Sequence, residues 1–224
     1  MPILCKPNDF PPYEKIQDDG LIDIGGHFSN ALLLKAYSLG IFPWFMHDGL
    51  IFWYCPLQRA LLFPEEVVIQ KSMRPIINLG KWQYKWDTCF RQTILLCRSV
   101  HENRSGSWIN DEFIVGYCRL HEAGYAHSLE IYEGSRLIGG LYGVSLGNFF
   151  SGESMFNLVP NASKYAIIIL AQEMKRLGYH FIDCQILNPF TQSMGAVNVE
   201  CEIFLQMLKE AMKHATHIGS WTYR

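Results

Sequence analysis

Two short apolar segments of this chain each carry a carboxylate where a β-strand is expected. Glu153 lies within residues 150–156, and Asp183 lies within residues 182–185. A carboxylate buried among apolar side chains costs free energy unless it is paired with another group or used in chemistry. The two segments therefore predict either a polar site set into an apolar wall, or two structural carboxylates held by backbone or basic groups.

Composition limits the classes of protein that this chain can be. Of its 224 residues 49% are apolar and 18% are charged, which is typical of a globular protein with one large or two small domains. The 19 basic and 21 acidic side chains give a net charge of -2, which argues against non-specific wrapping of nucleic acid. The 7 cysteines include no Cys-x-x-Cys pair, so we expect free thiols in a reducing compartment, no disulfide framework and no metal.

The segment 71–91 is locally basic, with Lys71 and Arg74 at its start and aromatic residues further along. Such a segment suits either a nucleic-acid contact or a solvated helix and strand, and composition alone favours the second interpretation. The first residues carry an acid and several prolines in place of a basic-then-apolar leader, and no apolar run reaches membrane-spanning length. We therefore expect a cytoplasmic protein with no membrane partner.

The N-terminal part of the chain predicts a small unit. The expected elements are a helix capped by Ser29 or Asn30 and ended by Gly40, an aromatic loop at 40–45 and a strand at 51–54. A boundary near residue 62 then divides the chain into a small N-terminal domain, 1–62, and a larger domain, 63–224.

The larger part predicts alternating helices and strands. The expected elements are a strand at 65–70, a helix at 71–79, a strand at 84–87, helices at 88–100 and from the cap Asn110 to Gly124, strands at 127–132, 136–145 and 148–155, a helix at 162–177 after the cap Asn161, a strand at 180–186 and a helix at 200–214. Three antiparallel strands followed by a strand–helix–strand step give a mixed sheet with helices on its faces, an α/β (α+β) fold. In such sheets ligands bind where strands part or end, and Glu153 and Asp183 are placed there.

With these segments placed, the sequence resembles the leucyl/phenylalanyl-tRNA–protein transferase family of bacteria. The shared motifs occur in the family's order over roughly residues 20–200, and although each motif alone is weak, the ordered set is specific. The motifs include Gly25-Gly26, Gly40-Ile41-Phe42-Pro43-Trp44-Phe45, Phe52-Trp53 with Arg59-Ala60, Gly106-Ser107-Trp108-Ile109, Leu120-His121-Glu122 with Gly124-Tyr125-Ala126-His127-Ser128, Gly139-Gly140-Leu141-Tyr142-Gly143-Val144, Gly152-Glu153-Ser154-Met155-Phe156, Ala162-Ser163-Lys164, Ile182-Asp183-Cys184-Gln185 and Ser193-Met194-Gly195-Ala196.

The resemblance implies a small N-terminal domain, a larger C-terminal domain with a GNAT-like acyltransferase fold, and no cofactor. It implies transfer of leucine or phenylalanine, and less well methionine, from Leu-tRNA or Phe-tRNA to an acceptor protein with N-terminal Arg or Lys. The product is marked for degradation in the N-degron pathway. Because the aminoacyl ester is already activated, positioning of the amine against its carbonyl supplies much of the rate. We expect the enzyme to be a monomer.

By the same resemblance, Asp183 and Gln185 are the catalytic pair. In a regular strand their side chains share one face and Cys184 takes the other. Asp183 either orients Gln185, whose amide oxygen accepts from the incoming amine, or assists proton movement directly. We favour a positioning role for Gln185, because an amide is a weak base. Glu153 matches the pocket floor of the family, where it either binds the substrate α-amino group or holds its strand.

The resemblance also implies contacts with the tRNA and with the aminoacyl side chain. Trp44 and Trp108 match the tryptophans that hold the terminal adenine, which would place this site between the two domains. Lys71 and Arg74 match basic residues along the acceptor stem, where they would position phosphates without reading sequence. The side-chain pocket is matched by Leu141, Phe150, Glu153, Met155 and Ile182.

The sequence departs from the family in three places. A Gly-Gly-Asp motif ends in His27 here, and a histidine of the family is replaced by Phe190. A Pro-Arg-Arg segment becomes Glu200-Cys201-Glu202, which replaces two positive charges with a cysteine and an acid. Any tRNA or substrate contact at this last segment is therefore in question.

Two other functions compete with this assignment. A GNAT-type enzyme with an acyl-CoA donor predicts a glycine-rich pyrophosphate loop before the helix at 162–177, and residues 158–161 contain no glycine. A non-catalytic tRNA-binding module needs the aromatic and basic residues but neither Asp183 nor Gln185. Substitution of Asp183 separates these functions, because binding would survive while transfer would fall only in the enzyme.

Overall fold

The computed structural model describes residues 10–102 and 107–222, which contain two β-sheets. The strands are β1 (Leu21–Ile24), β2 (Phe42–His47), β3 (Leu50–Tyr54), β4 (Gln58–Leu62), β5 (Gln83–Trp86), β6 (Ala126–Glu133), β7 (Arg136–Leu146), β8 (Phe149–Asn157), β9 (Phe181–Gln185) and β10 (Val197–Glu200). The smaller sheet has the order β1-β3-β2, and the larger has the order β10-β4-β9-β8-β7-β6-β5.

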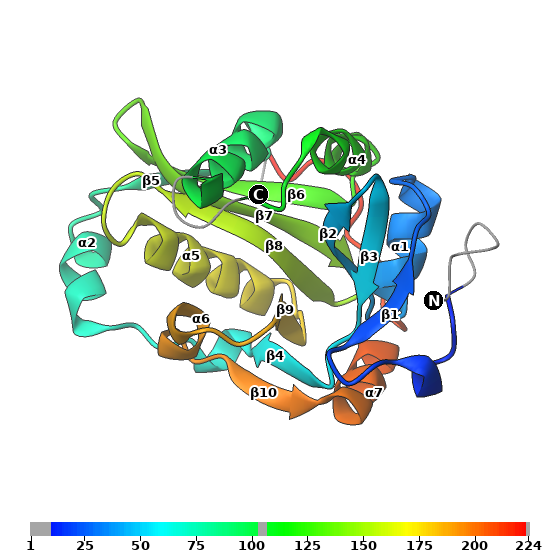
Figure 1. Cartoon of the computed structure of the whole chain (residues 1–224). Coiled ribbons are helices and arrows are strands. Elements are labelled where there is room, and N and C mark those ends of the chain that lie inside the picture. Colours follow the sequence, from blue (N-terminus) through cyan, green and yellow to red (C-terminus); the bar gives the residue numbers. More distant parts are fainter. Residues whose placement is uncertain (1–9, 103–106, 223–224) are drawn as a thin grey trace.

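Helices cover both faces of the larger sheet (Figure 1). They are α1 (Asn30–Ser38), α2 (Arg74–Asn78), α3 (Phe90–Glu102), α4 (Asp111–Glu122), α5 (Ala162–Arg176), α6 (Pro189–Ser193) and α7 (Cys201–Ala211), with 3-10 turns at Tyr13–Lys15, Pro64–Glu66 and Lys71–Met73. One buried apolar cluster joins α3, α4 and α7 to the smaller sheet, and a second lies beneath α5. Because the first cluster contains residues of both sheets, they share one continuous core.

The larger sheet is mixed, as predicted. Strands β6, β7 and β8 form an antiparallel meander, and β9 then returns parallel to β8 after the helix α5. Neighbouring side chains on a strand face opposite sides, so Phe149 enters one apolar cluster and Phe150 enters the other. The sheet is therefore apolar on both faces, which explains why helices are required on each side.

The smaller sheet corrects the expectation of an aromatic loop at 40–45. Most of that segment is β2, which forms a hairpin with β3 through Asp48 and Gly49, both at positive φ. An Asp-Gly pair is a strong signal for a two-residue hairpin turn. Pro43 is tolerated because β2 is the edge strand of this sheet. The predicted helix before it is confirmed, with the Ser29 hydroxyl accepting from the backbone N–H of Leu32.

Two other local predictions were wrong. Residues 65–70 are not a strand, because Pro64 begins a 3-10 turn and the chain then continues without regular structure to residue 70. Asn161 stands before α5 but does not cap it through its side chain, since its backbone adopts φ 73° and no capping hydrogen bond forms. By contrast, the Asn110 side chain caps α4 as predicted, accepting from the N–H of Phe113.

The predicted domain division near residue 62 remains a prediction. Strand β4, just before that position, pairs with β9 and β10 in the larger sheet, so the part before residue 62 contributes to both sheets. Within residues 10–102 and 107–222, no helix is long and apolar enough to cross a membrane. The helix α5, for example, has 15 residues, whereas a membrane-spanning helix needs about 20.

Candidate active site

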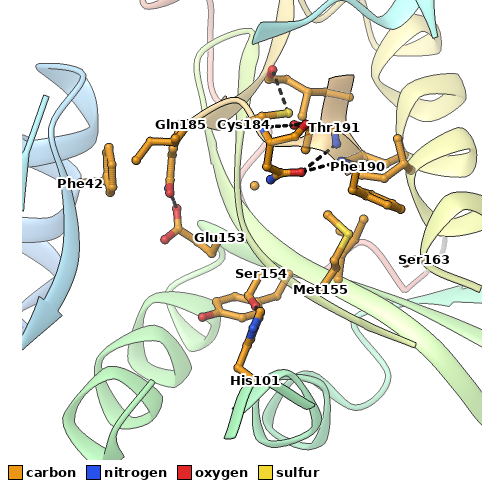
Figure 2. Close-up of a pocket in the computed structure, with 18 of the residues that line it drawn as sticks. Phe42, His101, Glu153, Ser154, Met155, Ser163, Cys184, Gln185, Phe190 and Thr191 are labelled. Atoms are coloured by element: carbon orange, nitrogen blue, oxygen red, sulfur yellow. Dashed lines mark hydrogen bonds between the residues drawn. The ribbon is translucent and has the colours of Figure 1, made fainter. Parts of the chain in front are cut away.

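A pocket opens in the larger sheet where β8 and β9 part. The two strands pair only from Phe149 to Ser151 on β8, opposite Phe181 to Asp183 on β9, and beyond these residues they diverge. The resulting cavity has a volume of about 450 Å³. Figure 2 shows Glu153 and Gln185 pointing toward each other from the two separating strands. The pocket therefore lies where two strands of the sheet part, and the functional site there stays a prediction.

Asp183 lies behind this pocket, in a buried ion pair. The guanidinium of Arg59 on β4 donates from Nε to Oδ1 at 2.8 Å and from Nη2 to Oδ2 at 2.6 Å. Both side chains are 1% exposed, and Asp183 is not among the residues that line the pocket. Removing two charges from water is unfavourable unless the geometry is good and hydrogen bonds are satisfied. The two-pronged contact meets that condition for both oxygens of the carboxylate.

Aromatic rings hold Arg59 in place. Its guanidinium carbon lies 4.8 Å from the ring centre of Phe42 on β2 and 4.6 Å from that of Phe204 on α7. Contacts of this kind are favourable for a desolvated cation. They connect the smaller sheet and the last helix to the ion pair. Arg59 occurs in one of the family motifs, but the local sequence predicts no role for it, because its partner is 124 residues away.

Gln185 is held at both its backbone and its side chain. Its backbone has φ 62°, a left-handed conformation that costs free energy for a residue with a side chain. The N–H of Gln185 donates to Oδ1 of Asp183 at 2.9 Å, which fixes this bend, and its side-chain amide donates to Oε1 of Glu153 at 2.9 Å. The amide oxygen of Gln185 accepts no hydrogen bond from the part of the chain that the structure describes.

This bend changes which residues face the pocket. Regular alternation predicted Asp183 and Gln185 on one face and Cys184 on the other, and the structure corrects that expectation. Ile182, Cys184 and Gln185 all line the pocket, whereas Asp183 points to Arg59. The positive φ at Gln185 ends the regular strand geometry and brings its side chain onto the pocket side.

Glu153 forms the polar floor of the pocket. It is 8% exposed and accepts hydrogen bonds from the hydroxyls of Tyr117 at 2.8 Å and Ser151 at 3.1 Å, as well as from Gln185. Burial, which disfavours the charged form, raises the pKa of Glu153 to about 7 despite these hydrogen bonds. The Tyr117 hydroxyl is in turn hydrogen-bonded to that of Tyr37 on α1. A chain of buried polar groups therefore runs from α1 to Gln185.

The two predicted tryptophans line the same pocket from different parts of the chain. Trp44 comes from β2 and is 36% exposed, and Trp108 is half-buried just before α4. The Trp44 ring packs edge-on against Tyr54, and the Trp108 ring packs edge-on against Phe113. Each ring is thus supported on the protein side while it also borders the cavity.

The rest of the pocket is largely apolar. Leu141, Met155 and Ile182, which the resemblance implies for the aminoacyl side-chain pocket, line it, whereas Phe150 is fully buried and does not. His101 at the end of α3, which sequence analysis did not single out, also lines it (Figure 2), and its Nε2 lies 3.0 Å from the Ser154 hydroxyl.

Phe190 and the basic residues have different positions relative to this cavity. Phe190 lines the pocket from α6. Lys71 and Arg74 are exposed around the start of α2 and do not line it. Among the described residues, no group of three His, Cys, Asp or Glu side chains is arranged to hold a metal ion.

Comparison with known proteins identifies a family. The sequence profile of the leucyl/phenylalanyl-tRNA protein transferases matches residues 61–209, and that of their N-terminal domain matches residues 26–57. A leucyl/phenylalanyl-tRNA–protein transferase of Myxococcus xanthus is 41% identical over 96% of this chain and 93% of its own. One of Flavobacterium psychrophilum is 43% identical over 94% of this chain and all of its own.

Solved structures similar to this chain share little of its sequence. L-PGS from Bacillus licheniformis aligns over 80% of this chain and 69% of its own, with a TM-score of 0.45 and 10% identity. An aminoglycoside acetyltransferase from a soil metagenome aligns over 50% of this chain and 84% of its own, with a TM-score of 0.38 and 15% identity.

The chain thus combines a mixed sheet that has helices on both faces with a largely apolar pocket that has a polar floor. The sequence matches identify the class of protein, because the family model and the relatives cover most of the chain. The chain belongs to the leucyl/phenylalanyl-tRNA–protein transferase family. It is therefore an aminoacyltransferase.

Proposed function

We propose that this enzyme transfers leucine or phenylalanine, and less well methionine, from Leu-tRNA or Phe-tRNA to proteins with N-terminal Arg or Lys. The reaction forms a peptide bond, releases the tRNA and marks the acceptor for N-degron degradation. One observation carries the proposal: an apolar pocket of about 450 Å³ has Glu153 and Gln185 at its floor and a tryptophan from each of two separate segments at its border. A cytoplasmic location and a monomeric state remain predictions.

The pocket wall suits an unbranched or γ-branched apolar side chain. Leu141, Met155 and Ile182 present aliphatic and thioether groups to the cavity. Methionine adapts its shape readily, which supports acceptance of leucine, phenylalanine and methionine by one site. Shape alone discriminates by about 1–3 kcal/mol per methylene, so the preference among these substrates is expected to be graded.

We propose that Gln185 contacts the reacting amine and that Asp183 positions it. The free amide oxygen of Gln185 can accept a hydrogen bond from the incoming α-amino group and hold the nitrogen lone pair toward the ester carbonyl. Asp183 has both oxygens engaged by Arg59 and is 1% exposed, which supports a positioning role over direct proton transfer. Arg59 completes this support by holding the carboxylate that holds the Gln185 backbone.

Glu153 serves the same arrangement from the other side of the pocket. Its Oε1 already accepts from Gln185 and Ser151, and its Oε2 accepts from Tyr117. These contacts favour orientation of the Gln185 amide over direct binding of the substrate amine. With its amide nitrogen held by Glu153, the Gln185 side chain presents its oxygen as the remaining hydrogen-bonding group.

We propose that Trp44 and Trp108 stack on the terminal adenosine of the tRNA. Stacking on aromatic rings is worth about 1–3 kcal/mol per base and does not depend on the identity of the rest of the strand. The exposed Lys71 and Arg74 would contact phosphates of the acceptor stem, so tRNA affinity should fall as salt concentration rises. The division of the chain at residue 62 would then place one tryptophan in each proposed domain.

The test is transfer of labelled leucine from Leu-tRNA to a peptide that begins with Arg, beside the same peptide beginning with Ala. It is run at low salt without ATP or coenzyme A, and a parallel reaction supplies labelled acetyl-CoA in place of the tRNA. Label from Leu-tRNA on the Arg peptide alone is the expected result. Label from acetyl-CoA would establish the acyl-CoA alternative, and tRNA binding without any transfer would establish a binding module.

The variant Gln185→Ala separates binding from chemistry in the same assay. It is expected to lower transfer by at least tenfold, because about 1.4 kcal/mol of positioning corresponds to a factor of ten, while binding of Leu-tRNA changes little. Gln192→Ala, an exposed glutamine on α6, is the matched control and should transfer at the wild-type rate. Transfer by Gln185→Ala at the control rate would refute the assigned role.

A further inference from the structure

Two buried thiols face each other outside the pocket. Cys55 follows β3 and Cys201 is the first residue of α7, and their sulfur atoms are 3.6 Å apart. The backbone N–H of Cys201 donates to the carbonyl of Leu57 at 2.9 Å, so the two segments are already fixed side by side. We propose that Cys55 and Cys201 are a redox modification site, at which a peroxide converts the two thiols into a reversible disulfide.

The geometry needs only a small adjustment to form the bond. A disulfide requires sulfur atoms about 2.05 Å apart, so the two sulfurs must approach by roughly 1.5 Å. Cys201 is 8% exposed whereas Cys55 is completely buried, so a small oxidant reaches Cys201 first. Other cysteines among the described residues, such as Cys97, Cys118 and Cys184, have no second sulfur within hydrogen-bonding distance.

The surroundings favour a thiolate at Cys201. A thiol at the first position of a helix is stabilised in its charged form by the helix N-terminus. The hydrogen bond with Cys55, together with the nearby Arg59 cation, lowers the pKa of Cys201, although burial acts in the opposite direction. The same hydrogen bond and burial raise the pKa of Cys55. The other charged group facing Cys201 is Glu202, which opposes the effect, and Asp183 acts on Cys55. By contrast, burial raises the pKa of Cys118.

The reaction balances with hydrogen peroxide as the oxidant. The Cys201 thiolate attacks one peroxide oxygen, the O–O bond breaks, and a sulfenic acid and hydroxide form. The Cys55 sulfur then attacks the sulfenic sulfur, the S–O bond breaks, and the S–S bond forms. Each of the two steps releases one hydroxide. The two hydroxides take up the protons of the Cys55 and Cys201 thiols, so two waters result. Both sulfurs are oxidised, the peroxide is reduced, and a thiol reductant reverses the reaction.

This inference does not depend on the proposed transfer reaction. The disulfide would tie the start of α7 to the segment between β3 and β4, which lie together in Figure 1. Phe204, one turn further along α7, packs on Arg59. Oxidation therefore acts on the structure directly behind the active site.

The test is peptide mapping of the full chain after treatment with a modest excess of hydrogen peroxide. Remaining thiols are blocked, the protein is digested without reductant, and linked peptides are identified by mass spectrometry. We expect a peptide pair joined through Cys55 and Cys201, and a loss of two of the 7 thiols that a reductant restores. The proposal is overturned if that pair is absent while Cys89, Cys118 or Cys184 is oxidised.

Two variants test the order of the steps. In Cys55→Ser the second step is blocked, so dimedone should label Cys201 as a sulfenic acid, whereas in Cys201→Ser it should leave Cys55 unlabelled. Cys118→Ser is the matched control and should still lose two thiols. Equal labelling of Cys55 and Cys201 in the two variants would contradict the assignment. If Cys55→Ser does not fold, as judged by circular dichroism, the mapping of the wild type decides the proposal alone.

Discussion

Titration of Glu153 makes the free energy of unfolding depend on pH, and the isosteric substitution Glu153→Gln removes this dependence. The folded-state pKa of Glu153, about 7, lies above the ordinary value of 4.5 because of burial. The folded state therefore holds a proton more tightly than the unfolded state, and the resulting stabilisation is fully present below about pH 4.5. It declines as pH rises and is lost once the pH passes about 7. At about 1.4 kcal/mol per pKa unit, the change between pH 5 and pH 8 is about 2–3 kcal/mol.

The measurement compares urea unfolding of the wild type and Glu153→Gln at pH 5 and pH 8. Other titrating groups contribute equally to both proteins, so the difference between their free energies of unfolding isolates Glu153. We expect the wild type to lose about 2–3 kcal/mol relative to the variant on going from pH 5 to pH 8. Glu112→Gln, an exposed carboxylate on α4, is the control and should follow the wild type. A pH-independent difference between wild type and Glu153→Gln would refute the reasoning.

Two further substitutions test the ion pair and the stacking surface. Arg59→Met leaves the carboxylate of Asp183 buried without its partner and should reduce the free energy of unfolding by about 3–5 kcal/mol. Arg98→Met, the control, breaks ion pairs with exposed acids and should reduce it by less than about 1 kcal/mol. Equal losses of the two variants in urea titrations would contradict this expectation. Trp44→Ala removes a ring that packs on Tyr54, so circular dichroism first checks that the variant is folded. It should weaken binding of an aminoacyl-adenosine by about 1–3 kcal/mol, measured by calorimetry, and an unchanged Kd would exclude stacking on this ring.

The fold was predictable where the local signals are strong. The antiparallel meander, α5 and the capped helices α1 and α4 follow from alternation, glycine turns and capping residues in one stretch of sequence. Strands β4 and β10 were missed because each is short and pairs only with distant parts of the chain. The loop predicted at 40–45 failed for another reason, since Pro43 argued against a strand that proved to be at an edge.

Some residues that surround the pocket were predictable, but Arg59, His101 and the geometry were not. Motif resemblance drew attention to Glu153, Asp183 and Gln185, and the structure brings all three together. Regular alternation could not foresee the positive φ at Gln185, which turns its side chain away from that of Asp183. Nor could it reveal Arg59, because nothing in a local pattern links two residues that are 124 positions apart.

The position of β4 in the larger sheet has a consequence for synthesis of the chain. Both of its neighbours, β9 and β10, come from the last part of the sequence, and Arg59 meets Asp183 across 124 residues. Until the ribosome has released that part, the apolar run of Ala60, Leu61 and Leu62 has two open edges and no partner strand. Contacts that close so late slow folding and expose strand edges to aggregation. Prematurely terminated chains should therefore be insoluble, and the active site can form only when translation is nearly finished.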